Sequence, residues 1–243
     1  CVGTATQTEV EEQVDLMYSL IHQQVDAIVL VPIDSKALVQ PVVEAVRKGV
    51  PVINIDIRLD TQLLEQAGVE VAFVGPDNFA AAYEVGKLLD KKLRNEDKVA
   101  IIEGLTAADN AQQRKRGFIK AIEEKGLRLV ASEPADWETE KAAEVFQAMW
   151  MRYPDLKAVY CSNDAMALGV LQQMQEKNCY LPVVGFDNDA VMKEFLSTGK
   201  LVATADIFSS QMAVRGIEFA LDVLEGKIEN RGVHSTAYEI IKQ

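Results

Sequence analysis

The sequence predicts an α/β fold in which parallel sheets are flanked by helices. Short β-branched segments alternate with longer amphipathic segments along almost all of the 243 residues, which is the pattern of repeated βαβ units. The segments that resemble strands are apolar on both faces, as Ala-Ile-Val-Leu-Val at 27–31 illustrates, and such strands lie between two layers of helices. The length allows one large domain or two smaller lobes.

Nine strands are expected, with helices between them. The expected strands are 26–32, 50–55, 71–75, 98–103, 127–132, 156–162, 181–186, 201–205 and 238–241. In the first helix, apolar residues recur every three or four positions from Val10 to Ile21, and Thr8 with Glu11 predicts a capping box at its start. Ser35 is expected to start the next helix, and Gly49 to end it.

Composition excludes several classes of protein. The chain has 25 Lys and Arg against 37 Asp and Glu, a net charge of −12, so phosphate backbones and anionic lipid would repel it, and no nucleic-acid partner is expected. Cys1, Cys161 and Cys179 form no C-x-x-C pair, which excludes a disulfide framework. No apolar run is long enough to span a bilayer, and the beginning of the chain has no signal-peptide pattern. We therefore expect a soluble chain.

The motifs of several enzyme classes are absent. The sequence contains no G-x-G-x-x-G, P-loop, G-x-S-x-G or H-E-x-x-H motif. His22 and His234 have no nearby Cys or His partner in the sequence, so a structural role is the simpler interpretation of both. We expect no catalytic residue, no metal site and no cofactor.

Polar residues gather where expected strands end. Asp56, Asn163 and Asp187 each directly follow an expected strand, and open parallel sheets bind ligands outside the carboxyl ends of their strands. Carboxylates and carboxamides hydrogen-bond to vicinal hydroxyls, Arg114 adds a forked donor, and Trp137 could stack on the C–H face of a sugar ring. This set favours a neutral polyol as the ligand.

Each of these residues also has a purely structural interpretation. Asp and Asn after a strand often cap the next helix. Trp137 could cover core, and Arg114 could belong to a solvated basic run at 114–116. Paired carboxylates could instead be the acid and nucleophile of a glycosidase, but no residue pattern identifies an acid with a raised pKa.

In order, these segments resemble the periplasmic sugar-binding protein family of the ribose-binding type, which has the periplasmic binding protein-like I fold and shares its lobes with lactose-repressor-type regulators. The most specific match is Asn-Asp-Ala-Met-Ala-Leu-Gly at 163–169 followed by Val-Gly-Phe-Asp at 184–187. Further matching segments are 25–28, 34–38, 49–56, 113–118, 134–137 and 201–204.

The resemblance implies two Rossmann-like lobes joined by three crossovers, with a ligand cleft between them. The crossings are expected near Asp77, Asp206 and Gly232. Lobe 1 would then comprise 1–76 and 207–233, and lobe 2 would comprise 77–206 and 234–243. The family begins with a strand and a helix that have no counterpart in this sequence, so lobe 1 is expected to be incomplete at its N-terminus.

The resemblance also assigns residues to the site. Four positions match family residues that contact sugar hydroxyls, and a fifth matches the ring-stacking aromatic; they are Asp56, Arg114, Asn163, Asp187 and Trp137. Gln211 matches a recurrent residue after the second crossing.

This chain also departs from ribose binders at three positions. Ile57 separates the first-lobe Asp from Arg58, and Val31 and Ile207 replace an amide and a glutamine. Arg58 and Ile207, at two of these positions, and Gln211, at the matching position given above, are possible site residues. The loss of polar contacts argues against ribose itself and leaves open a less hydroxylated sugar, another polyol or a molecule with an apolar part.

The leading functional hypothesis is the solute-binding component of an ABC-type sugar transporter, which is not an enzyme. It would bind a monosaccharide or polyol by closing its lobes and would present the closed form to a membrane permease or a membrane sensor. Its expected location is the periplasm, or the outer face of a membrane as an anchored lipoprotein. One alternative is the effector-binding core of a lactose-repressor-type regulator, and another is a glycosidase or isomerase acting on the bound sugar.

Overall fold

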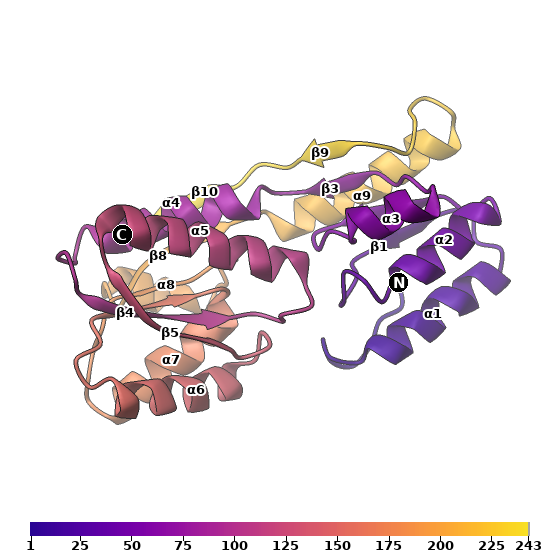
Figure 1. Ribbon diagram of the computed structural model, residues 1–243. Coiled ribbons are helices and arrows are strands. Elements are labelled where there is room, and N and C mark those ends of the chain that lie inside the picture. Colours follow the sequence, from indigo (N-terminus) through magenta and orange to yellow (C-terminus); the bar gives the residue numbers. More distant parts are fainter. Residues whose placement is uncertain (243) are drawn as a thin grey trace. The chain divides into compact units, whose positions relative to one another are not determined.

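The computed structural model describes residues 1–242, which form two compact units. Unit 1 consists of Cys1–Pro76, Ala107–Asn110 and Phe208–Ala237, and unit 2 of Asp77–Thr106, Ala111–Ile207 and the residues from Tyr238 onward. Each unit is a sheet flanked by helices (Figure 1), so the predicted α/β class is confirmed. Residues 107–110 and 234–237 lie in unit 1, whereas the sequence analysis assigns them to the second lobe. The functional lobe boundaries stay predictions.

Unit 1 is built on a four-stranded parallel sheet. Its strands, in spatial order, are β1 (Ile28–Leu30), β2 (Val52–Ile55), β3 (Phe73–Gly75) and β9 (Val233–Ser235). Its helices are α1 (Val10–His22), α2 (Val39–Arg47), α3 (Thr61–Ala67) and α9 (Ser209–Leu224).

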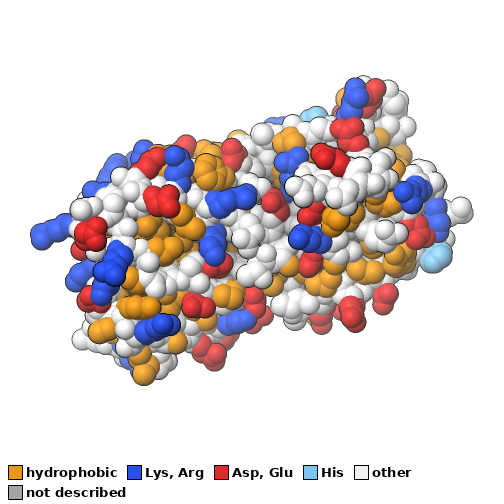
Figure 2. All heavy atoms as spheres, viewed as in Figure 1, with side chains coloured by type: hydrophobic (Ala, Val, Ile, Leu, Met, Phe, Trp, Pro, Cys, Tyr) orange, Lys and Arg blue, Asp and Glu red, His pale blue; other side chains and the backbone are white. Residues whose placement is uncertain are grey.

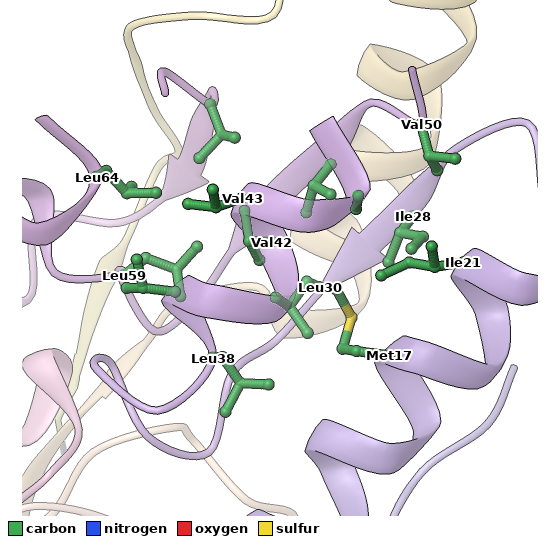
Figure 3. Packing of buried hydrophobic residues seen from close by; sticks show 14 residues of the cluster. Met17, Ile21, Ile28, Leu30, Leu38, Val42, Val43, Val50, Leu59 and Leu64 are labelled. Atoms are coloured by element: carbon green, nitrogen blue, oxygen red, sulfur yellow. The ribbon is translucent and has the colours of Figure 1, made fainter. Parts of the chain in front are cut away.

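Helices cover both faces of the sheet of unit 1, and neighbouring residues of a strand point to opposite faces. Val52 joins a core cluster with Met17 and Ile21 of α1, and with residues of α2 and α3 (Figure 3). The next residue, Ile53, packs on the other face against Ala220 of α9. This arrangement explains why the sequences of these strands are apolar on both faces.

The exposed side of α1 is acidic. Acidic side chains gather where this helix lies (Figure 2), and Glu11, Glu12 and Asp15 are exposed residues of the helix. The opposite side carries Met17 and Ile21 into the core. The predicted amphipathic helix is therefore confirmed.

Both predicted helix starts in unit 1 are wrong. The residue before α1 is Glu9, whose side chain does not cap the helix. Its carboxylate instead accepts the Thr6 N–H at 2.7 Å. The N–H and the hydroxyl of Thr8 bond to Thr6 Oγ1 at 3.4 and 3.1 Å, so Thr8 does not form the expected capping box with Glu11. Helix α2 begins at Val39 rather than near Ser35, because the Asp34 carboxylate first closes a turn by accepting the N–H groups of residues 36 and 37.

Unit 2 is built on a six-stranded sheet. Its strands, in spatial order, are β10 (Glu239–Lys242), β8 (Leu201–Asp206), β7 (Val183–Val184), β6 (Ala158–Cys161), β4 (Lys98–Glu103) and β5 (Arg128–Pro134). Only β10 is antiparallel to its neighbour among these described strands. The helices are α4 (Asn78–Asp90), α5 (Asp109–Lys125, whose first two residues belong to unit 1), α6 (Thr139–Arg152), α7 (Asp164–Glu176) and α8 (Met192–Ser197).

Helices cover both faces of this sheet. Helices α4 and α5 lie on one face, and α6 and α7 on the other (Figure 1). A Cβ at Gly86 of α4 would lie 2.9 Å from the Ala121 methyl of α5, and one at Gly169 of α7 would lie 2.0 Å from the Thr139 carbonyl oxygen of α6. Glycine at these two positions allows each helix pair to approach closely.

A strand overlaps each of the nine expected segments, and one strand, β9, was not expected. Its three residues are all exposed at the edge of the sheet, so its sequence has no apolar pattern. Among the described residues, no helix combines the length and apolar character needed to cross a membrane.

Candidate functional site

Four of the predicted site residues lie at one edge of unit 2. Trp137 follows β5, Asn163 follows β6, and Asp187 follows β7, while Arg114 lies in the second turn of α5. The carboxyl ends of parallel strands meet at this edge, which is where the sequence placed the ligand contacts. We call these four residues the candidate site.

Arg114 is buried, with 3% of its surface exposed. Its Nε donates to Asn78 Oδ1 at 2.9 Å, and one terminal nitrogen donates to the Ser162 carbonyl at 2.8 Å. The same nitrogen lies 3.4 Å from Asp187 Oδ1. Arg114 therefore does not belong to a solvated basic run, and a fixed guanidinium faces the carboxylate at the end of β7.

Aromatic rings frame this guanidinium. Its central carbon lies 3.8 Å from the centre of the Phe186 ring and 5.4 Å from that of Trp137. Trp137 is 7% exposed and lies against the backbone of Gly104, where a Cβ would fall 2.0 Å from the indole. The indole and the guanidinium are thus held by their surroundings in ring-to-cation geometry.

Asn163 has the structural role that the sequence analysis kept open. It precedes the first residue of α7, and its Oδ1 accepts the Met166 N–H at 2.8 Å. This is an N-cap bond. The residue lies at the edge of the candidate site, and a role in binding stays a prediction.

The loop that carries Asp187 has an unusual backbone. Asp187 has a φ of 109°, which costs energy for a residue with a side chain, and Asn188 has a φ of 59°, in the left-handed region that asparagine tolerates better than most residues. The N–H of Asp187 donates to the Ala205 carbonyl at 2.7 Å. The Asn188 N–H donates to Thr204 Oγ1 at 3.2 Å and the Asp189 N–H to Asp164 Oδ2 at 2.9 Å. Three successive N–H groups are therefore bonded.

Asp164 lies beneath this loop and has no exposed surface. Thr204 Oγ1 donates to its carboxylate at 3.0 and 3.1 Å. Burial raises the pKa of the Asp164 carboxyl to about 7, although the bonds from Asp189 and Thr204 favour the ionised form and lower the pKa in part. Sequence reasoning missed this residue; the available signal was an ionisable side chain one position after the cap of an apolar helix.

A second buried carboxylate lies at the end of β4. Glu103 is 4% exposed and accepts from Lys115 Nζ at 2.8 Å and from Ser132 Oγ at 2.5 Å. Lys115 follows Arg114 on α5, so adjacent cations of one helix contact two different parts of this edge. Sequence reasoning also missed Glu103, Asn78 and Ser162.

The remaining predicted residues do not join the candidate site within unit 2. Asp56 follows β2 in unit 1, has a φ of 61°, and donates its N–H to the Val74 carbonyl at 3.2 Å. Arg58 lies 5.5 Å from the centre of the Phe73 ring and lines a hollow of about 420 Å³ beside α3. Gln211 is exposed on α9. Ile207, the last residue of its unit 2 segment, is 3% exposed.

The chemistry of the candidate site is that of a neutral hydrogen-bonding surface beside an aromatic ring. One guanidinium and one carboxylate balance in charge and together offer donors and acceptors at fixed positions. Among the described residues, no cluster of three or more His, Cys, Asp or Glu side chains could hold a metal ion.

Comparison with known proteins gives consistent relatives. Residues 1–228 match the model of the periplasmic binding protein domain family. A D-ribose/D-allose-binding protein of Pseudomonas aeruginosa is 41% identical over 98% of this chain and 76% of its own length.

Similar proteins with solved structures are also solute-binding proteins. A solute-binding protein of an ABC transporter from Burkholderia multivorans, solved with an unknown ligand, is 39% identical with a TM-score of 0.94, over 99% of this chain and 86% of that one. A periplasmic solute-binding protein from Actinobacillus succinogenes with bound D-allose is 32% identical with a TM-score of 0.89, over 96% and 84%. This chain belongs to the periplasmic binding protein domain family, as its resemblance to ribose-type sugar binders implied.

Proposed function

We propose that this chain is the solute-binding component of an ABC-type sugar transporter and that it binds a monosaccharide or related polyol reversibly. The observation that carries the proposal is the Arg114–Asp187 pair, which is fixed at the strand ends of unit 2 beside Trp137. Vicinal hydroxyls donate to a carboxylate and accept from a guanidinium, and neither group then needs a charged ligand. The relatives described above are binding proteins, which favours this function over the regulator and enzyme alternatives.

The sugars to test first are D-allose and D-ribose. Both occur in the name of the Pseudomonas relative, and D-allose is bound in the Actinobacillus structure. The apolar residues Val31 and Ile207 replace polar positions of ribose binders, so we propose that D-ribose is not the preferred sugar. We propose that D-allose, which the Actinobacillus relative binds, has the higher affinity. Titration calorimetry with each sugar measures the two affinities directly. If the protein binds neither sugar, this assignment is contradicted.

The site residues are tested by matched substitutions on one helix. Arg114→Met keeps the length of the side chain but removes the donors to Asn78, Ser162 and Asp187, whereas Arg116→Met removes an exposed cation two residues away. Each lost hydrogen bond to a charged group is worth about 1.5–3 kcal/mol, so we expect at least about tenfold weaker sugar binding for the first variant and an unchanged affinity for the second. Equal affinities in a folded Arg114→Met variant would remove Arg114 from the site.

The wider organisation is part of the proposal. Lobe 1 (1–76 and 207–233) and lobe 2 (77–206 and 234–243) close on the sugar, with Asp56 supplied by lobe 1 and Asn163 by lobe 2. Arg58, Ile207 and Gln211 stay possible contacts. The closed form is recognised by a membrane permease or sensor, and the protein works in the periplasm or as a lipoprotein anchored outside the membrane. No catalysis accompanies binding.

A further inference from the structure

The loop at residues 187–189 is held by side chains that do not themselves belong to the candidate site. Its conformation is strained at Asp187, whose φ of 109° is unusual for a residue with a side chain, and it continues into the left-handed region at Asn188. Such backbone persists only where the surroundings fix it. The position of the Asp187 carboxylate therefore depends on the groups that hold the loop.

Those groups form one connected network. Thr204 Oγ1 accepts the Asn188 N–H and donates to Asp164, and the Asp164 carboxylate accepts the Asp189 N–H. Asp164 and Thr204 have 0% exposure, so these bonds are shielded from solvent on the side of the two acceptors. A Cβ at Gly185 would lie 2.0 Å from Asp164 Oδ1, so the carboxylate also packs against the backbone just before the loop.

We propose that Asp164 and Thr204 are positioning residues that hold the 187–189 loop so that Asp187 faces Arg114 in the geometry that binds sugar. They act through Asp187 and do not contact the ligand. This inference rests on the proposed function for its binding readout, but the loop geometry is testable without any sugar.

Thr204 offers a matched pair of substitutions. Thr204→Ser keeps the hydroxyl, whereas Thr204→Val keeps the shape and removes it. In the ligand-free protein, NMR hydrogen exchange of the amides of residues 188 and 189 should stay slow in Thr204→Ser and accelerate at least about tenfold in Thr204→Val. Exchange at the unsubstituted rate in Thr204→Val would overturn the positioning role.

The binding arm uses D-allose and titration calorimetry. Thr204→Val should bind D-allose about fivefold to twentyfold more weakly, and Thr204→Ser should stay within about twofold of the unsubstituted chain. In an Asp187→Ala background the Thr204→Val substitution should have no further effect, because the residue through which it acts is gone. An additive loss in the double variant, or unchanged affinity in Thr204→Val, would overturn the proposal.

Asp164 is tested in the same two ways. Asp164→Asn keeps an oxygen that can accept the Asp189 N–H, whereas Asp164→Ala removes it, so only the alanine variant should lose amide protection and affinity. If Asp164→Ala does not fold, the comparison of Thr204→Ser with Thr204→Val still tests the positioning role. Should the unsubstituted chain not bind D-allose, the sugar assignment fails, while the exchange measurement separately supports or overturns the positioning role.

Discussion

Replacing Asp164 with asparagine is expected to change how the stability of the protein depends on pH. The carboxyl is fully buried, and burial raises its pKa from 3.8 to about 7. A shift of about three units at about 1.4 kcal/mol per unit corresponds to about 4 kcal/mol between the protonated and ionised folded states. Asparagine resembles the protonated acid in shape and cannot ionise.

The direction follows from proton linkage. Between pH 4 and 7 the folded carboxyl holds a proton that the unfolded carboxyl has released, so the free energy of unfolding falls as pH rises through this window. The stabilisation is complete below the unfolded pKa and is lost above the folded one. Asp164→Asn lacks this dependence, so its stability relative to the unsubstituted chain should rise by about 4 kcal/mol from pH 4 to pH 8.

The assay is denaturant unfolding of both proteins at matched ionic strength, at one-unit steps from pH 4 to pH 8. All other titrating groups are common to the two chains, so the difference between the two free energies isolates Asp164. A difference that stays constant across the range, or that falls with rising pH, would refute the reasoning that burial dominates the titration of this carboxyl.

Three further substitutions test packing and charge. Gly104→Ala places a Cβ 2.0 Å from the Trp137 indole and should lower the free energy of unfolding by about 1–3 kcal/mol, whereas Gly3→Ala, with nothing within 4 Å, should be neutral in the same urea titration. Leu38→Ala removes a side chain with no exposed surface and should lower the free energy of unfolding by about 2–5 kcal/mol. Leu221→Ala, at a residue that is 52% exposed, should lower it by less than about 0.5 kcal/mol. Equal losses of stability in thermal or urea unfolding would contradict the assignment of the core. Lys115→Met leaves the buried Glu103 carboxylate without its cation and should destabilise the protein by about 1–3 kcal/mol. Adding Glu103→Gln to this variant should recover part of the lost stability. A double variant that is less stable than Lys115→Met alone would contradict a stabilising ion pair between Lys115 and Glu103.

The fold was predictable from the sequence because its strands alternate with helices and are buried on both faces. Residues 52 and 53 illustrate the reason, since one faces the α1–α3 side and the next faces α9. Strand β9 could not be predicted in this way. Its residues are exposed at an edge and are paired only through the β3 backbone, so the interaction that makes it a strand leaves no mark on its side chains.

The helix starts in unit 1 show a second limit. The residues 34 and 35 both suit an N-cap, and the structure uses each in a different way. The Asp34 carboxylate caps a turn that precedes α2, whereas Ser35 Oγ accepts the N–H of Asp109, 74 positions along the chain. Local patterns identify polar side chains that bond to backbone, but the choice of partner depends on segments far away in sequence.

The candidate site, too, was only partly predictable from the sequence. Trp137, Asn163 and Asp187 could be predicted at this edge because they follow parallel strands, and Arg114 because it lies near the start of the helix after β4. Their orientation could not be found, because it is determined by residues whose roles appear only in three dimensions. Asp187 follows β7, but Thr204 of β8 and Asp164 of α7 hold its loop. Gly104 follows β4 and accommodates the indole of Trp137 from the β5 side.

Contact residues and supporting residues can both affect which sugar binds. A change of sugar can arise from a contact residue, but it can also arise from a supporting residue that moves an unchanged Asp187 or Trp137. Relatives that share Arg114 and Asp187 can therefore differ in ligand, and the residues that match position 104, 164 or 204 should be compared before a sugar is assigned from the contact residues alone. In this chain these three supporting positions pack against or hydrogen-bond to parts of the candidate-site edge, so the geometry offered to a sugar is a property of the whole edge of unit 2.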